Sequence, residues 1–199
     1  MDIQTSKIEL VKLILDIDNT EFFQKVTNFI KNENERSEVQ ISNIIKKALS
    51  IVNPSIINHH ITVIQNNKDD MILDGYENQL IQALINILNN SKDALKEHIK
   101  EGDNRLIFIE TKTIINGFII KIRDNAGGIP ENVIKKIFEP YFTTKHKSIG
   151  TGIGLSITHQ IVTKHHDANI TASNETYEYN DKTYTGACFS ILFNRNSLK

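Results

Sequence analysis

The feature that most constrains this chain is a long amphipathic stretch followed directly by a hairpin pattern. Residues 76–100 carry apolar side chains at spacings of three and four, which predicts one long helix with a single buried face. Residues 105–113 and 117–123 are β-rich, and Asn116-Gly117 between them is a strong hairpin signal. Such a helix buries its apolar face against a neighbouring layer, so we predict helices packed on a sheet. The predicted buried face consists of Leu80, Ala83, Leu84, Ile87, Leu88, Ser91 and Leu95.

The rest of the chain extends this pattern in both directions. Residues 3–33 are predicted to form one or two amphipathic helices, and residues 32–38 a polar linker. Ser37 and Gln40 are spaced as a capping box for a helix that ends near Pro54. Shorter predicted elements are a strand at 60–65, a turn at Asp74-Gly75, a short helix opened by Pro130, a helix that runs to residue 165, and strands at 168–173 and 185–193 around a polar excursion.

These elements predict the fold class α/β, as a two-layer α/β sandwich with an N-terminal helical segment. Helices would cover one face of a mostly antiparallel sheet. We expect the helical segment to occupy residues 1–36 and the main domain residues 37–199.

Composition narrows the class of function. The 23 Lys and Arg residues nearly balance 24 Asp and Glu residues, for a formal net charge of -1, so we expect no nucleic-acid partner and only a local anion site. A single cysteine, Cys188, excludes an internal disulfide and a cysteine-based zinc site, which fits a reducing compartment. No apolar stretch reaches the ~18 residues that span a bilayer, and the first residues lack the pattern of a signal peptide.

Two short motifs carry polar groups that can bind a ligand. Asn86 and Asn90 lie one helical turn apart, so an amide oxygen on this face can complete the shell of a phosphate-bound Mg²⁺; a plain polar stripe is the alternative. Residues 124–130, DNAGGIP, follow a strand, where Asp124 can accept a hydrogen bond from an exocyclic amine and small residues admit a flat ring. An ordinary tight turn is the alternative there.

Two further motifs follow along the chain. Residues 137–145, IFEPYFTTK, join an aromatic hinge to a hydroxyl-rich, basic loop. Residues 150–155, GTGIGL, open a helix whose backbone N–H groups and positive dipole end attract phosphate. Because this glycine run follows a polar loop and not a strand, it is not a dinucleotide fingerprint.

In this order and spacing, the four motifs resemble the N, G1, F and G2 boxes of the ATP-binding domain of sensor histidine kinases, within the wider family that includes gyrase, MutL and chaperone ATPases. The match covers residues 37–193, and Gly186-Ala187-Cys188-Phe189 is similar to the last, G3-like box. The resemblance implies the Bergerat fold, with ATP between the N-box helix and a mobile lid. It also implies transfer of the ATP γ-phosphoryl group to a histidine on a dimerisation helix, and then to the receiver domain of a response regulator.

The resemblance also implies roles for single residues. The implied catalytic residues are Asn86, Asn90 and Lys145, with Asn90 as the ligand of Mg²⁺. The implied ATP contacts are Asp124 at the adenine amino group, Ala126, Gly128 and Ile129 at the pocket floor, Thr144 and Lys145 in the lid, and Gly150, Thr151, Gly152, Gly154 and Leu155 at the helix entrance.

Asn86 separates the possible activities. Relatives that hydrolyse ATP have a glutamate at the matching position, and an amide cannot abstract a proton from water. We therefore expect a phosphoryl donor, a histidine protein kinase, rather than an ATP-hydrolysing clamp. An ATP-sensing module without phosphotransfer activity is the main alternative.

The sequence departs from the family in several places. None of the seven histidines has the context of a phosphoacceptor, so we expect each to be solvent-exposed or capping, and the chain to be a fragment that is inactive alone. Ala126 replaces the first glycine of the G1 box, His166-Asp167 replaces a Gly-Gly pair, and Ala187-Cys188 leave the G3-like box without a hydroxyl, for which Thr185 or Ser190 can substitute.

The N-terminal segment leaves the assembly open. Residues 1–36 are similar to the second helix of a dimerisation hairpin, which implies a homodimer, but the segment can equally fold back on the domain. The resemblance implies that this domain is cytoplasmic. A membrane anchor elsewhere in a full-length protein stays open.

Overall fold

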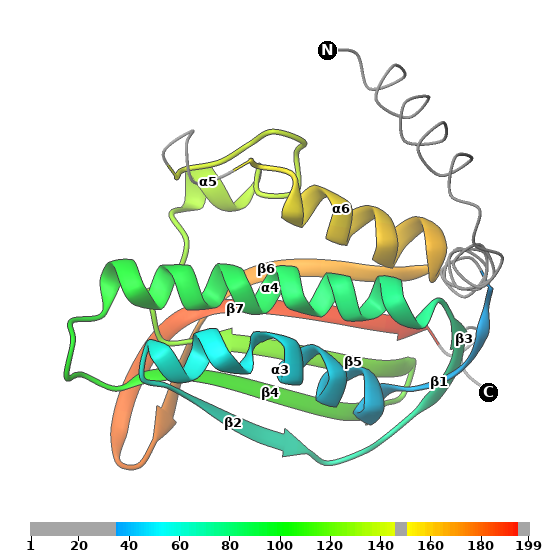
Figure 1. Ribbon diagram of the computed structural model, residues 1–199, viewed down its shortest axis with the longest axis horizontal. Helices are drawn as coiled ribbons and strands as arrows, with labels where there is room; N and C mark the ends of the chain where they lie inside the picture. Colours follow the sequence, from blue (N-terminus) through cyan, green and yellow to red (C-terminus); the bar gives the residue numbers. More distant parts are fainter. Residues whose placement is uncertain (1–34, 146–150, 195–199) are drawn as a thin grey trace, which may run out of the picture. The chain divides into compact units, whose positions relative to one another are not determined.

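The computed structural model describes residues 35–145 and 151–194, so the predicted helices within residues 3–33 lie outside the described residues. The described part alternates helices and strands (Figure 1). In chain order the elements are β1 (Ser37–Gln40), α3 (Ile41–Asn58), β2 (Ile61–Asn67), β3 (Ile72–Gly75), α4 (Glu77–His98), β4 (Arg105–Ile114), β5 (Gly117–Asp124), α5 (Glu131–Ile134), α6 (Gly154–Gln160), the π-helix η1 (Ile161–His165), β6 (Ala168–Tyr179) and β7 (Lys182–Asn194).

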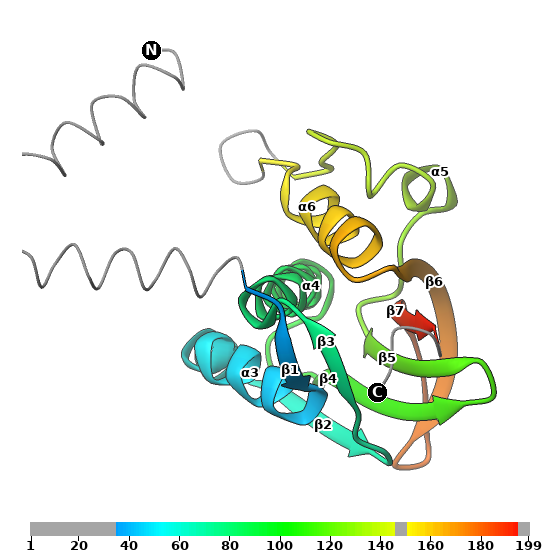
Figure 2. The same ribbon diagram turned by 90° about the vertical axis from the view of Figure 1, so that its right-hand side faces the viewer.

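One five-stranded sheet forms the framework of the domain. Its strand order is β2-β4-β5-β7-β6, with β2 parallel to β4 and every other neighbouring pair antiparallel. The chain passes from β2 through β3 and α4 to β4, which is the crossover that a parallel pair requires. Strands β1 and β3 form a separate antiparallel pair. In Figures 1 and 2, α3, α4 and α6 lie on the same face of the large sheet, which confirms the predicted α/β sandwich.

The core lies between those helices and the inner face of the sheet. Every residue of the predicted apolar face of α4 is buried. From the sheet, Phe118 on β5 and Phe193 on β7 are directly paired and 0% exposed. Each such side chain contributes about 1.5–3 kcal/mol to folding through burial, so the predicted stripe positions α4 on the sheet. Among the described residues, no helix is long and apolar enough to cross a lipid bilayer.

The start of α3 differs from the prediction. The helix begins at Ile41 as expected, but the Ser37 and Gln40 side chains form no capping box, because residues 37–40 are the strand β1. The cap comes from a residue distant in sequence: Asp70 Oδ1 accepts a hydrogen bond of 3.0 Å from Ser42 N. Residues 37 and 38, assigned to a linker, are therefore held in a strand by pairing with Gly75 and Asp74.

Three further boundaries were predicted wrongly. α3 continues past Pro54 to Asn58, because Ile56 is buried beyond the proline and this packing outweighs the lost backbone hydrogen bond. Gly75 ends the strand β3 and is not in a turn. The residues predicted to form a polar excursion between the last two strands instead extend both strands. β6 and β7 pair as one long hairpin up to Tyr179 and Lys182.

Candidate functional site

A cleft of about 240 Å³ lies between α4, the segment 137–145 and the start of α6. It brings together eight of the predicted site residues, from three separate parts of the chain: Asn86, Asn90, Thr144, Lys145, Thr151, Gly152, Gly154 and Leu155. Five other lining residues were not named individually as site residues, although three of them belong to the motif 137–145: Asn89, Val133, Ile137, Phe142 and Thr143. Val133 and Ile137 are spaced by four, which was the available signal for a shared apolar wall. Gly150 lies outside the described residues.

Asn86 and Asn90 occupy the cleft side of α4, as their spacing predicted. Asn86 Nδ2 donates hydrogen bonds to Gly154 O at 3.0 Å and to Thr158 Oγ1 at 3.2 Å, so it joins α4 to α6. Asn90 Nδ2 donates to Asn86 O at 2.9 Å. Because the amide nitrogen of Asn90 is held by the helix backbone, its oxygen is the atom left for a ligand.

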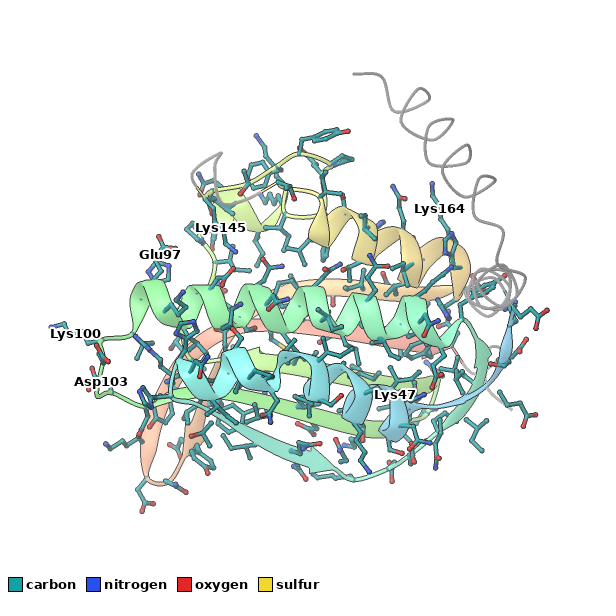
Figure 3. The ribbon with its side chains drawn as sticks, viewed as in Figure 1. Lys47, Glu97, Lys100, Asp103, Lys145 and Lys164 are labelled. Carbon is teal, nitrogen blue, oxygen red and sulfur yellow. The ribbon has the colours of Figure 1, made fainter. Side chains whose placement is uncertain are left out.

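Lys145 reaches α4 from the segment that borders the cleft. Its Nζ lies 2.6 Å from Asp93 Oδ2, and Lys92 Nζ lies 3.5 Å from the other carboxylate oxygen. Figure 3 shows Lys145 beside α4, on the side facing α5. Burial alone would raise the pKa of Asp93, but the bonds and charges of Lys145 and Lys92 outweigh burial and hold that pKa below its ordinary value. The cationic group of the cleft is therefore anchored by a carboxylate one turn of α4 beyond Asn90.

The backbone of Gly152 lies close to the backbone of Tyr141 and Phe142. Its φ is +66°, and a Cβ there would lie 2.5 Å from the carbonyl carbon of Tyr141. Tyr141 itself has φ +64° and is 77% exposed. Gly152 is therefore required by the close approach of two backbone segments, in addition to any contact with phosphate.

Asp124 lies at the end of β5 and is 1% exposed. Its Oδ1 accepts hydrogen bonds from the backbone N–H groups of Ala126 and Ala187, each at 3.1 Å. Burial raises the pKa of Asp124, although both N–H groups favour the charged form. The Ser91 hydroxyl lies close enough to oppose this rise, yet it is buried without a hydrogen-bond partner within 3.5 Å among the described residues. A buried, unpartnered hydroxyl beside a buried carboxylate fits a site that a polar ligand or a bridging water completes.

The predicted floor residues follow Asp124 but do not line the cleft. Ala126 is not among the described residues with positive φ, which explains why alanine is accepted where relatives have glycine. Gly128 has φ +92°, so glycine is favoured at that position.

β7 passes so close to this turn that a Cβ at Gly186 would lie 1.6 Å from Asp124 O. This contact explains the glycine of the G3-like box. Both residues named as substitutes for the hydroxyl missing from that box have side-chain partners of their own. Thr185 Oγ1 lies 3.0 Å from Thr176 Oγ1, and Ser190 Oγ lies 3.6 Å from Cys188 Sγ. The buried Ser91 hydroxyl on α4 has no hydrogen-bond partner among the described residues, which makes it the candidate for that role. A lone hydroxyl within an otherwise apolar helical stripe was the signal for this role.

His166 is buried rather than solvent-exposed, and it has a capping position, as the C-cap of η1. It is 2% exposed; its Nε2 accepts a hydrogen bond of 3.0 Å from Tyr76 N, and its Nδ1 lies 2.9 Å from Ile161 O. Burial lowers the pKa of His166, so the ring is held neutral. The next residue, Asp167, has φ +48°, which is the left-handed conformation expected where relatives have glycine.

The chain is similar to proteins of one family. A family model described as histidine kinase-, DNA gyrase B-, and HSP90-like ATPase matches residues 75–197. Sporulation kinase C of Bacillus subtilis is 32% identical over 138 residues, which cover 68% of this chain and 30% of that protein. The two-component sensor PprA of Pseudomonas aeruginosa is 36% identical over 106 residues, which cover 53% of this chain and 11% of that protein. The chain therefore spans less than a third of either curated relative.

Solved structures of histidine kinases are also similar to this chain. A nucleotide-free catalytic domain of the histidine kinase ThkA matches with a TM-score of 0.66 and 25% identity, over 81% of this chain and 98% of that one. The mycobacterial sensor histidine kinase MprB matches in fold with a TM-score of 0.65 and 20% identity, over 80% of this chain and 97% of that one.

Proposed function

This chain belongs to the family of histidine kinase-, DNA gyrase B-, and HSP90-like ATPases, as an ATP-binding catalytic domain of the histidine kinase type, and we propose that it donates the ATP γ-phosphoryl group to a histidine outside residues 1–199. The observation that carries this proposal is Asp124. A carboxylate buried at the end of a central strand, beside the unpartnered Ser91 hydroxyl, is suited to accept a hydrogen bond from the adenine amino group. With adenine at Asp124, the phosphates would extend toward the cleft and the start of α6.

The groups around the cleft suit phosphate and Mg²⁺. The Asn90 oxygen is the proposed ligand of Mg²⁺, because the amide nitrogen of that side chain is already held by Asn86 O. When bound, Mg²⁺ would neutralise part of the phosphate charge. Lys145 would supply a second positive charge, and the backbone N–H groups from Thr151 to Leu155 would bind phosphate oxygens.

Asn86 supports phosphoryl donation over hydrolysis. Its amide cannot act as a general base toward water. Its nitrogen donates to Gly154 O and Thr158 Oγ1, so the side chain holds the start of α6 in place. We infer that Asn86 serves the reaction by fixing the phosphate end of the site.

The proposed partners follow from the similarity to sensor histidine kinases. The acceptor histidine would lie on a dimerisation helix, and the phosphoryl group would then pass to the receiver domain of a response regulator. Within the proposed division of the chain, residues 1–36 would form part of a dimerisation hairpin shared with a second copy, and residues 37–199 the catalytic domain.

Phosphoryl labelling tests the proposal. The full chain is incubated with Mg²⁺ and γ-labelled ATP, with and without a two-helix hairpin that carries a histidine kinase phosphoacceptor. We expect acid-labile label on the hairpin, lost in Asn90→Ala and Asp124→Ala, and little release of free phosphate. Binding of ATP without label on any hairpin would favour the ATP-sensing module. Rapid phosphate release without a hairpin, abolished by Asn86→Ala, would favour the hydrolysing clamp.

A further inference from the structure

Two side chains of β6 contact the turn that follows Asp124 from outside the cleft. The Tyr177 hydroxyl donates a hydrogen bond of 2.9 Å to Asp124 O. Asn174 makes two bonds to one residue: Ile129 N donates to Asn174 Oδ1 at 2.7 Å, and Asn174 Nδ2 donates to Ile129 O at 2.8 Å. Figure 2 shows β6 beside the segment that leads from β5 to α5. The two ends of the turn, at Asp124 and Ile129, are therefore both tied to the same strand.

The glycine in this turn fits Asn174 closely. A Cβ at Gly128 would lie 2.6 Å from Asn174 Oδ1 and 2.8 Å from its Cγ. The absence of a side chain at Gly128 thus admits the Asn174 amide against the backbone, in addition to permitting the φ of +92°. This requirement comes from within the protein and does not involve a nucleotide.

Packing against neighbouring side chains fixes the position of the Tyr177 ring. It packs edge-on against Phe108, with centroids 5.0 Å apart, and Arg123 lies 5.0 Å over its face. Arg123 is held in turn by Glu110 at 3.3 Å and Glu175 at 3.4 Å. Burial raises the pKa of Tyr177 above its ordinary value, so the hydroxyl keeps its proton and remains a donor. A preorganised donor loses little freedom when it bonds, which makes this contact an effective constraint.

β7 holds the same turn at other atoms. Ala187 N donates to Asp124 Oδ1 at 3.1 Å, and Gly127 N donates to Thr185 O at 3.0 Å. The β6–β7 hairpin therefore fixes both the carboxylate and the backbone of the segment that would bind adenine.

From these contacts we infer that Asn174 and Tyr177 are positioning residues for adenine recognition. This inference rests on the function proposed above. They set where the Asp124 carboxylate lies relative to the floor at Ile129. The discrimination between adenine and a base without the amino group depends on that placement, because only a correctly placed carboxylate distinguishes a donor from an acceptor at the same position of the ring.

The test compares ATP with inosine triphosphate, whose base has an oxygen in place of the amino group. Dissociation constants for both are measured on the full chain and on Asn174→Ala and Tyr177→Phe. Tyr179→Phe is a matched control, since Tyr179 packs on Phe108 at 5.1 Å from the same strand and its hydroxyl has no hydrogen bond to any described residue. Asn169→Ala is the control for asparagine, because Asn169 is exposed on β6 and its side chain bonds to none of the described residues.

We expect ATP affinity to fall about fivefold in Asn174→Ala and about threefold in Tyr177→Phe, with smaller losses for inosine triphosphate, so the preference for ATP narrows. Both controls should match the unmodified chain. Unchanged ATP preference in two folded variants would overturn the inference, while loss of ATP binding in Asp124→Ala alone would leave the proposed function standing.

Amide hydrogen exchange without nucleotide gives an independent readout. In Asn174→Ala the Ile129 N–H loses its acceptor, so we expect its exchange to accelerate while the amides of α4 stay protected. An unchanged exchange rate of the Ile129 amide would overturn the proposed positioning role of Asn174. If the unmodified chain binds no ATP, both the role of Asn174 and Tyr177 in adenine recognition and the proposed function are overturned.

Discussion

At the scale of single residues, Asp93 determines where the ammonium group of Lys145 lies in the cleft. Its two carboxylate oxygens face Lys145 at 2.6 Å and Lys92 at 3.5 Å, but only Lys145 also lines the cleft. The two lysines therefore share a partner and differ in their access to phosphate. This difference allows the phosphate contact of Lys145 to be separated from its ion pair.

We predict that Lys145→Met weakens ATP binding about tenfold, because a charge-assisted bond to phosphate contributes about 1.5–3 kcal/mol. Adenosine, which has no phosphate, should bind with unchanged affinity. Lys92→Met is the control, since it removes a charge beside Asp93 without removing one from the cleft. The affinities are measured by titration calorimetry. Equal losses in the two variants, or an equal loss for adenosine, would contradict the phosphate contact.

A second prediction concerns His166, whose burial lowers its pKa below the ordinary 6.5. The folded protein keeps this ring neutral at pH values where the unfolded chain binds a proton. The stabilisation from His166 is therefore fully present above pH 6.5 and is lost as pH falls through the lower folded pKa. We predict that His166→Ala lowers the free energy of unfolding by about 2 kcal/mol at neutral pH, because Tyr76 N loses its acceptor, and that this difference shrinks toward acid pH.

Urea unfolding of both proteins across this pH range measures the difference. His165→Ala is the control, since the neighbouring ring is exposed. Among the described residues that ring contacts Gln79 Oε1 at 2.6 Å and packs on Tyr76, with ring centroids 6.1 Å apart. A difference for His166→Ala that stays constant with pH would contradict a neutral buried ring.

At the scale of elements, α3 depends on a cap from outside its own sequence. Asp70 accepts bonds from Ser42 N at 3.0 Å, Gln40 Nε2 at 2.8 Å and Met71 N at 2.8 Å, so one carboxylate joins the start of α3 to the start of β3. The helix has no acidic residue in its first turn. The stability of its N-terminus therefore relies on this distant side chain.

We predict that Asp70→Ala lowers the free energy of unfolding by about 1 kcal/mol, which is the usual cost of removing a helix cap. Asp70→Asn should lose less, because its amide oxygen can still accept from Ser42 N. The exposed Asp103 offers the control variant Asp103→Ala. Equilibrium unfolding in urea measures all three. The cap assignment fails if Asp70→Ala and Asp103→Ala are equally stable.

The elements that the sequence predicted well are those specified by local patterns. The stripe of α4 and the turn before Gly117 depend on residues close in sequence, so periodicity and hairpin signals were sufficient. The cap from Asp70 and the continuation of α3 through Pro54 depend on tertiary contacts, which no local pattern encodes. In the site, motif spacing identified the groups that line the cleft. It placed Ser91 on the buried face of the helix but assigned neither Ser91 nor Asn174 the role proposed above, because both proposals depend on α4 and β6 lying beside Asp124.

At the scale of the whole molecule, the site joins groups that are distant in sequence. α4 supplies Asn90, β5 supplies Asp124, and the β6–β7 hairpin holds the turn between Asp124 and Ile129. The core between α4 and the sheet therefore fixes the distance between Asp124, the proposed adenine contact, and Asn90, the proposed ligand of Mg²⁺. We therefore expect a domain built in this way to bind ATP and, under the proposed function, to transfer its phosphoryl group to a histidine on another segment.

Titration calorimetry of the full chain with ATP, with and without Mg²⁺, tests the central claim most directly when it is repeated on Asp124→Ala. We predict saturable binding that Mg²⁺ strengthens and that Asp124→Ala abolishes, while the variant still unfolds cooperatively. Absence of binding by a folded sample of the unmodified chain, or full binding by Asp124→Ala, would contradict the claim that this domain holds ATP through its buried carboxylate.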